Sequence, residues 1–411
     1  MSIISELNKP HEWRLAPLGR LTVRMQIRER PDLEPLSVFL DEGVVPRSYR
    51  DDNHNRLGDD LSKYLVVAPG DIVFNKLRTW QGGLGVSSHT GIVSPAYFVC
   101  RPLEDVNPRF LHYLLRSSVY LQELTRISKW MPPSQFDISW DELRRLPILL
   151  PYIKLQHDIA DYLDTTTTRI DSLISKKRRR LELIDERLQA QRDDWFQSLV
   201  SVHGLVSIRR WSHAIEQGWS PVCDSEPAGL GESGVIKTSA VSSGRFVAAN
   251  NKRLPPETEC DTRWLLHDGD LLVTRGSGSR SMVGRACVAY VGTQSLTLSD
   301  LVYRVRLTQA DPEFVAAALL SSPARAQIES SIRTDVGLTL KIRRDDLAAV
   351  RVPAVPFNRH MSEVARLTDR LSPQRAAKLL IERQIELLTE RKQALISALV
   401  SGEVSVPGTL P

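Results

Sequence analysis

The chain has 411 residues, of which 42% are hydrophobic and 25% are charged, so its composition is that of a folded globular protein. Lys and Arg outnumber Asp and Glu by 54 to 49, a small basic excess that favours an acidic partner without identifying one. The length predicts two or three domains, at about 150 residues per domain. No apolar run of about 18 residues could span a membrane, and no signal peptide is visible, so we expect a cytoplasmic protein.

Short β-like runs fill the first part of the chain, up to residue 152. They are bounded by Gly, Pro, Asp and Ser, and they include Tyr64 to Ala68, Asp71 to Phe74 and Pro95 to Cys100. A helical stretch from Pro108 to Leu124 begins with proline, which is favoured in a first helical turn. The mixture of strands and helices predicts an α+β domain over residues 1–152.

An amphipathic pattern follows over residues 153–202 and predicts one long helix. A sustained heptad seam of this kind requires a partner helix. The weakest part of this helix is the run Thr165 to Thr168. The seam residues that we expect to face the partner helix are Ile170, Ile174, Leu181, Ile184, Leu188 and Trp195.

The second half of the chain repeats the first half in the same order. Gly70-Asp71 and the three apolar residues after it recur 199 residues later, at Gly269-Asp270. The sequence ELIDER at residues 182–187 recurs 204 residues later as ELLTER. Four further matches keep the same order, at offsets between 200 and 205 residues. We therefore predict two copies of one unit of about 200 residues.

The second copy contains the same parts as the first. Residues 203–357 predict a second α+β domain, residues 358–403 a second long helix and residues 404–411 a C-terminal tail. Ser372-Pro373 should restart or kink this helix, because proline cannot donate a backbone hydrogen bond. Its expected seam residues are Leu371, Ile381, Ile385, Leu388, Leu395 and Leu399.

The predicted fold class is therefore α+β, with two α+β domains joined by two long antiparallel coiled-coil helices in a pseudo-two-fold internal repeat. Antiparallel seams would place the two domains at opposite ends of a rod. About 30 helical residues after each weak point give a spacer of about 45 Å. This length equals about 13 base pairs, so the arrangement suits two half-sites on duplex DNA.

The residues around the first long helix resemble a known protein family. The stretch Leu150 to Asp164 contains Gln156 and the sequence IADYLD, and RIDSLI follows at Arg169 to Ile174. Together with the closing segment Arg391 to Val404, these residues resemble the specificity subunits of type I restriction-modification systems. The second helix matches IADYLD only loosely, at Val364 to Asp369.

The resemblance implies a non-catalytic subunit without a cofactor. Residues 1–152 and 203–357 would be two target-recognition domains, each reading one half of a split site in double-stranded DNA. The helices over 153–202 and 358–403 would set the spacing and dock two adenine methyltransferase subunits. ATP-dependent restriction subunits would join the complete complex.

Sequence motifs for chemistry within the chain itself are incomplete. Asn107 to Phe110 differs from the Asn-Pro-Pro-Tyr/Phe turn of adenine methyltransferases by Arg109, and we expect an ordinary helix start there. The acid-x-Lys pair Glu390 to Lys392 is far from Pro31-Asp32, which argues against a nuclease site. The sequence has no phosphate-binding GxxxxGK[ST] loop, and its histidines lack metal-ligand spacing. The cysteines, which we expect to be lone buried thiols, are Cys100, Cys223, Cys260 and Cys287.

For DNA contacts we favour arginine, lysine and amide side chains in loops, because Arg suits guanine and Asn or Gln suits adenine. The Gly-rich segment Gly276 to Arg280 is either a DNA-facing loop or an ordinary hairpin turn. The basic run Lys176 to Arg180 is either a solvated helix face or a surface for phosphates or an acidic partner. The candidate DNA contacts are Arg47, Arg50, Asn53, Lys76, Arg78 and Gln81 in the first copy and Lys237, Asn250, Asn251, Lys252, Arg275 and Arg280 in the second.

Two other functions compete with a specificity subunit. An autonomous regulatory protein could use the same two domains to bind a bipartite DNA site. A structural scaffold could use the coiled coil to bridge proteins, although the repeated globular domains argue against that role.

Overall fold

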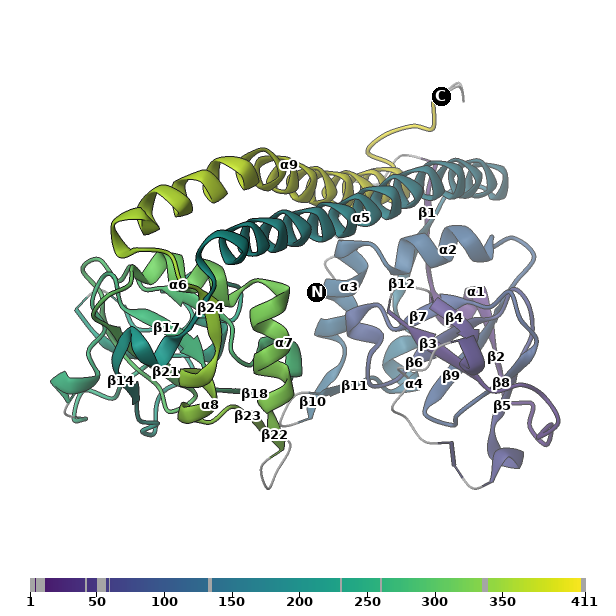
Figure 1. The fold of residues 1–411 in the computed structure, drawn as a ribbon. Helices are drawn as coiled ribbons and strands as arrows, with labels where there is room; N and C mark the ends of the chain where they lie inside the picture. Colours follow the sequence, from purple (N-terminus) through teal and green to yellow (C-terminus); the bar gives the residue numbers. More distant parts are fainter. Residues whose placement is uncertain are drawn as a thin grey trace. The chain divides into compact units, whose positions relative to one another are not determined.

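The computed structural model describes residues 4, 12–40, 43–49, 57–58, 60–131, 135–229, 231–258, 261–334 and 339–407. The chain forms two compact units, which we call unit 1 (Met1–Lys177 with Arg383–Pro411) and unit 2 (Arg178–Glu382). Two long helices, α5 (Ile153–His203) and α9 (His360–Ser401), each contribute one part to each unit (Figure 1). Among the described residues, no helix combines the length and apolarity needed to cross a membrane.

Unit 1 is built on a four-stranded antiparallel sheet in the order β2 (Thr22–Met25), β9 (Tyr97–Pro102), β6 (Ile72–Asn75) and β7 (Leu84–Val86). Four antiparallel pairs accompany it: β1 (Arg14–Pro17) with β12 (Pro147–Leu150), β3 (Leu36–Phe39) with β4 (Gly43–Pro46), β5 (Leu65–Val67) with β8 (Gly91–Val93), and β10 (Lys129–Met131) with β11 (Gln135–Asp137). The short helices are α1 (Leu18–Leu21), α2 (Pro108–Leu115), α3 (Ser118–Arg126) and α4 (Trp140–Leu143).

Unit 2 has the matching antiparallel sheet, in the order β14 (Ser212–Gln217), β21 (Val302–Leu307), β17 (Leu271–Thr274) and β19 (Ala286–Val288). Its other sheets are β13 (Leu205–Ser207) with β24 (Arg351–Pro353), β15 (Ser233–Ile236) between β16 (Asn251–Arg253) and β20 (Ser295–Thr297), and β23 (Leu340–Lys341) between β18 (Gly276–Ser277) and β22 (Arg333–Thr334). The short helices are α6 (Pro312–Leu319), α7 (Ser322–Ser331) and α8 (Arg344–Ala349).

The predicted α+β class and internal repeat are confirmed, because the central sheets of the two units have corresponding strand orders and similar short helices follow β9 and β21. One difference is that the helical stretch from Pro108 to Leu124 forms two helices, α2 and α3, instead of one. Ser117 has an extended backbone (φ −68°, ψ 154°), which separates the two helices, and its hydroxyl donates to the carbonyl of Leu114 (2.8 Å). Asn107 caps α2 by accepting hydrogen bonds from the backbone of Arg109 and Phe110, so the sequence Asn107 to Phe110 is a helix start.

The two long helices run antiparallel within each unit. In unit 1, Lys392 of α9 forms an ion pair with Asp171 of α5 (2.7 Å). In unit 2, Lys378 of α9 pairs with Asp185 of α5 (2.6 Å), and Arg370 of α9 pairs with Asp194 of α5 (2.9 Å). A later residue of α5 thus pairs with an earlier residue of α9, as expected for antiparallel helices. Exposed ion pairs contribute at most about 1 kcal/mol each, so the apolar seam supplies most of the stabilisation. None of the twelve expected seam residues is exposed.

The helices are continuous where the sequence predicted weakness. The sequence marks Thr165 to Thr168 as the weakest part of the first helix, and α5 continues through all four residues. The hydroxyl of Thr165 donates to the carbonyl of Asp161 (2.9 Å), so the side chain is satisfied without breaking the helix. At Ser372-Pro373 the sequence predicts a restart or a kink. The restart is absent, because α9 contains Pro373 within one helix, and the kink stays a prediction.

One buried side chain near the start of each long helix joins the helix to the domain. In unit 1, Gln156 accepts from the backbone N–H of Asn107 (2.8 Å) and donates to the carbonyl of Pro151 (2.8 Å). In unit 2, His360 Nδ1 accepts from the N–H of Asp311 (3.1 Å) and Nε2 donates to the carbonyl of Val355 (2.8 Å). The side chain, the N–H donor and the carbonyl acceptor of the first copy each lie 204 residues before their counterparts in the second copy. The neutral imidazole of His360 therefore makes the same two hydrogen bonds as the amide of Gln156.

This difference predicts a pH dependence that one substitution should remove. Burial lowers the pKa of His360 below its ordinary 6.5, although the nearby Asp311 carboxylate opposes the shift. The unfolded chain therefore binds the proton more tightly, and unit 2 should lose stability as pH falls through 6.5, by at most about 1.4 kcal/mol per pH unit. His360→Gln should flatten this loss, as measured by urea unfolding between pH 7.5 and about pH 5.

Gln156→His is the reciprocal variant and should add a similar acid-dependent loss to unit 1. Unit 1 has its own buried histidine, His112, whose pKa is lowered to about 4 by burial, so each variant must be compared with the unmodified chain. Equal pH dependence of the unmodified chain and His360→Gln would contradict the assignment.

Candidate nucleic-acid interface

A Gly-Asp turn fixes one strand of the central sheet in both units. Gly70 and Gly269 adopt left-handed backbone conformations, with φ of +89° and +90°. The buried carboxylate of Asp71 accepts from the N–H of Ala68 (2.9 Å) and binds Arg101 of the neighbouring strand (2.8 Å). The turn thus ties two neighbouring strands together through one carboxylate.

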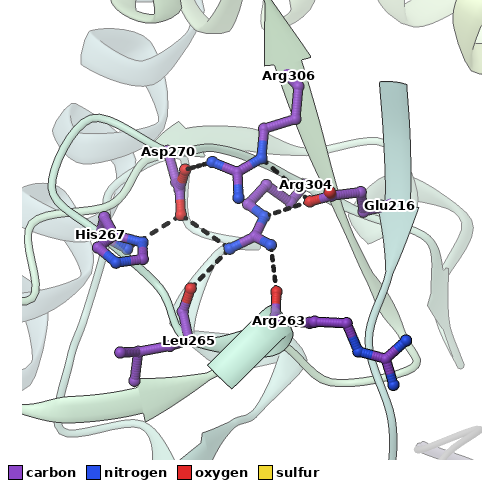
Figure 2. A network of polar contacts seen from close by, with 7 residues as sticks. All are labelled: Glu216, Arg263, Leu265, His267, Asp270, Arg304 and Arg306. Atoms are coloured by element: carbon purple, nitrogen blue, oxygen red, sulfur yellow. Dashed lines mark hydrogen bonds and ion pairs between the residues drawn. The ribbon is translucent and has the colours of Figure 1, made fainter. Parts of the chain in front are cut away.

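Unit 2 repeats this turn and enlarges it into the network drawn in Figure 2. Asp270 accepts from the N–H of His267 (3.0 Å) and binds Arg306 (2.9 Å). Arg304, only 1% exposed, binds Glu216 (2.6 Å) and also donates to the carbonyls of Leu265 (2.7 Å) and Arg263 (2.6 Å).

The arginines of the network are neutralised by carboxylates of the same network. Burial alone would raise the pKa of Glu216, but the guanidiniums of Arg304 and Arg306 lower it below its ordinary value. Figure 2 shows these two guanidiniums between the carboxylates of Glu216 and Asp270. The network therefore holds the edge strand β14 in place, and we do not count its arginines as DNA contacts.

A cation lies over an aromatic ring at the same place in both units, directly after the strand that follows the Gly-Asp turn. In unit 1, Lys76 Nζ is 4.7 Å from the ring centre of Phe98 and donates to the carbonyl of Pro95 (2.9 Å). In unit 2, Arg275 is 5.9 Å from the ring centre of Tyr303 and donates to its hydroxyl (3.2 Å). These contacts hold each cation in one place at the end of its strand.

Arg275 and Tyr303 also line a groove of about 520 Å³ in unit 2, which we call the basic groove. Five of its lining side chains are cationic and one is acidic. Residues of β14, β22, β23 and the start of α8 contribute to it. Its lining residues are Gln217, Arg275, Tyr303, Arg333, Lys341, Ile342, Arg343, Arg344 and Asp345.

The other predicted contacts of unit 2 lie in different places. Lys237 and Lys252 line a second groove, of about 410 Å³. Asn250 is half-buried and donates to the carbonyl of Ser239 (3.1 Å). Arg280 is exposed and donates to the carbonyl of Glu329 (2.7 Å).

The structure does not support Asn251 as a DNA contact. Its side chain is only 1% exposed. The amide oxygen accepts from the N–H of Ala228 (2.7 Å), and the amide nitrogen donates to the carbonyl of Ala248 (2.8 Å). Both ends of the amide therefore stabilise the domain itself.

The described candidates of unit 1 gather around the loop after β6. Arg78 and Gln81 are exposed on this loop. Burial raises the pKa of Tyr97, and the charges of Arg78 and Arg47 oppose that shift, which places both arginines near this tyrosine. Arg50 and Asn53 lie outside the described residues.

Sequence reasoning missed four cations of the basic groove, namely Arg333, Lys341, Arg343 and Arg344. The run Lys341 to Arg344, three cations in four residues, was the available signal. In unit 1 it also missed Arg24, which lies 5.1 Å from the ring centre of Phe98.

No metal-binding cluster of three or more His, Cys, Asp or Glu side chains occurs among the described residues. Cys100, Cys223 and Cys287 are free thiols, and Cys260 lies outside the described part of the chain. Burial raises the pKa of the Cys100 thiol to about 12, so this cysteine is not a reactive thiolate at neutral pH.

No protein-family model matches the chain. The chain is 27% identical to the type I restriction enzyme EcoEI specificity subunit of Escherichia coli over 158 residues, which cover 38% of this chain and 26% of that protein. It is 24% identical to the type I restriction enzyme EcoKI specificity subunit of Escherichia coli (strain K12) over 396 residues, which cover 88% of this chain and 82% of that protein. The chain thus spans about a quarter of the first relative and most of the second.

The fold is also similar to that of a solved chain from work on complex assembly and conformational transition of the type I R-M system. The TM-score is 0.60 at 17% sequence identity, and the match covers 97% of this chain and 100% of the other. This similarity concerns the fold alone.

The Gly-Asp turns lead to a stability prediction. Gly70→Ala and Gly269→Ala should each lower the free energy of unfolding of their unit by about 1 kcal/mol, because alanine disfavours a left-handed backbone. An added Cβ would meet no atom within 4 Å at either position, so the cost comes from the backbone alone. Urea unfolding measures the change.

Gly278→Ala is the matched control, because its added Cβ also meets no atom within 4 Å and its backbone is outside the left-handed region. An equal loss of stability in all three variants would contradict the role of the turns.

Proposed function

We propose that this chain, which belongs to the specificity subunits of type I restriction enzymes, is the non-catalytic subunit that recognises the DNA sequence for such an enzyme. The observation that carries the proposal is the basic groove of unit 2, together with the equivalent cation at Lys76 in unit 1. Five cations around one groove neutralise phosphates, and arginine forks also suit base edges.

Two copies of one domain favour a bipartite site. Each domain presents a fixed cation after the same strand, so each would contact the DNA backbone in a similar way. The surrounding side chains differ between the copies, and they would read different bases. In this reading the two half-sites have different sequences.

The long helices would carry the partner subunits. We propose that two adenine methyltransferase subunits dock on them and that ATP-dependent restriction subunits join through these. Most of the basic run Lys176 to Arg180 is exposed on α5, which supports its availability to an acidic partner surface or to phosphates. We also propose that the protein acts in the cytoplasm, where it would meet its DNA.

Sequencing of N6-methyladenine in cells with and without the gene tests the function. We expect the deletion to remove methylation at one split motif, since the methyltransferase subunits would lose their sequence specificity. Unchanged methylation, with no methyltransferase co-purifying with the chain, would contradict the proposal and favour an autonomous DNA-binding regulator.

The groove predicts a change in salt dependence. Replacing Arg343 and Arg344 together by Gln should reduce the slope of log affinity against log salt by about 1 to 2, because up to two phosphate contacts are lost. Fluorescence anisotropy with a duplex that contains the motif measures the slope. Arg383→Gln is the control, because Arg383 is exposed on α9 and pairs with Glu386 (2.8 Å). An unchanged slope in the double variant would exclude the groove from DNA binding.

A further inference from the structure

Four arginines of unit 2 come together on a surface that the proposed DNA contacts do not use. Arg192 comes from α5, Arg375 from α9, Arg245 from the loop before β16, and Arg285 from the position before β19. They line two adjoining grooves of about 300 Å³ each, which share Arg192, Arg245 and Arg375. We call these four residues the arginine cluster.

The positive charges of the cluster outnumber the negative charges in the lining of the two grooves. Among the described residues, none of the four forms an ion pair. Arg192 donates to the side-chain oxygen of Gln189 (3.0 Å), and Arg285 donates to the carbonyl of Ser281 (3.1 Å), so both bind neutral acceptors. Neutral acceptors do not offset the repulsion between like charges.

The acidic side chains around the cluster are fewer than its arginines. Burial lowers the pKa of Arg192 and of Arg375, and the charges of Asp193 and Glu313, respectively, oppose these shifts only in part. Glu313 accepts from the hydroxyl of Tyr290 (2.7 Å), and Asp193 accepts from the N–H of Ser322 (2.7 Å). Lys378, a fifth cation of the lining, is neutralised by Asp185 (2.6 Å). Glu382 is the remaining carboxylate of the lining, so four guanidiniums face two carboxylates, Glu313 and Glu382.

Burial makes this arrangement costly for the folded chain. Burial lowers the pKa of Arg192 to about 10, and the charges of Arg375 and Arg285 add to the decrease. Burial also lowers the pKa of Arg375, with a further contribution from Arg245. Half-buried cations that repel one another are destabilising unless an anion joins them, and such groups concentrate at binding sites.

The helix pair of the first copy carries a different charge at one position of the cluster. The repeat equivalent of Arg375, 204 residues earlier, is Asp171. In unit 1 this aspartate forms an ion pair with Lys392 (2.7 Å) across the helix pair. The excess of positive charge is therefore a property of the second copy and not a requirement of the helix pair.

The shape of the site indicates the kind of anion. Guanidinium forks bind phosphate oxygens in pairs, and several forks around one space suit a multiply charged group. Beside the cluster, the first groove has an apolar wall that includes Ala316, Leu320 and Leu367, with Phe246 and Tyr290 also in its lining. This wall can cover the organic part of a phosphorylated molecule.

We propose that the arginine cluster binds a small polyphosphate compound, such as a nucleoside triphosphate, with its phosphates on Arg192, Arg245, Arg285 and Arg375 and its organic part against the apolar wall. This site is independent of the basic groove, so the DNA proposal stands or fails separately. A phosphate of the DNA backbone has the same chemistry, and the experiment separates the two sources.

Calorimetric titration of the full-length chain with ATP and with pyrophosphate, in magnesium-free buffer at constant ionic strength, tests the proposal. We expect one site per chain for each probe, with tighter binding of ATP because the apolar wall adds contacts. Arg192→Gln and Arg375→Gln should each weaken binding at least about tenfold, and Arg375→Lys should weaken it less. In phosphate-free buffer, both Gln variants should melt at a higher temperature than the unmodified chain, because each removes one of the repelling charges. A cooperative melting transition also shows that the variants are folded.

Arg370→Gln is the matched control, because Arg370 lies on the same helix but pairs with Asp194 (2.9 Å) outside both grooves. It should bind ATP like the unmodified chain. Absence of binding, several weak sites, or equal binding in all variants would overturn the proposal. Displacement of ATP by duplex DNA, with loss of DNA affinity in the Gln variants, would assign the cluster to the DNA backbone instead. Loss of a co-purifying protein partner without any phosphate binding would assign it to an acidic protein surface.

Discussion

Each unit completes its hydrophobic core with residues from both long helices, and the rest of the structure depends on this. The core of unit 1 contains Leu163 of α5 and Leu399 of α9, beside residues of its own sheet. The core of unit 2 contains Trp195 of α5 and Leu371 of α9. Neither domain can bury its apolar surface without a segment from the other copy. The antiparallel direction of the helices within each unit and the register of their ion pairs follow from this requirement.

Much of the fold could be predicted because its signals are local or periodic. Heptad spacing predicted the two helices, and the repeat of Gly70-Asp71 at Gly269-Asp270 marked the same turn in both domains. The threonine run and Pro373 do not end either helix, because residues of low helix propensity interrupt a helix only where packing does not hold it. Propensity is a small effect, and a buried seam outweighs it.

The sites were harder to predict because burial and partners decide what a polar residue does. Asn251 has the side chain that suits adenine, yet its amide is fully used inside the domain. Gln156 and His360 share one role, but sequence comparison treats them as different. Arginine shows the difficulty most clearly. Arg304 forms an ion pair with Glu216 of the paired strand β14, 88 residues earlier in the sequence, whereas Arg375 forms no ion pair among the described residues, and no local pattern distinguishes the two arginines.

The two domains combine a common framework with different surroundings. Lys76 over Phe98 and Arg275 over Tyr303 keep one cation at one place in both copies. Around it, unit 1 has aromatic rings: Trp140 lies 5.6 Å from Phe98, and Trp80 and Trp130 each lie 4.9 Å from Phe136 between ring centres. Unit 2 has Arg344 at the repeat position of Trp140, and Arg333, Lys341 and Arg343 nearby. A fixed phosphate contact needs the same geometry in both halves, whereas base reading needs different side chains. A duplicated domain that keeps its central sheet, while the side chains around the fixed cation differ between the copies, meets both requirements.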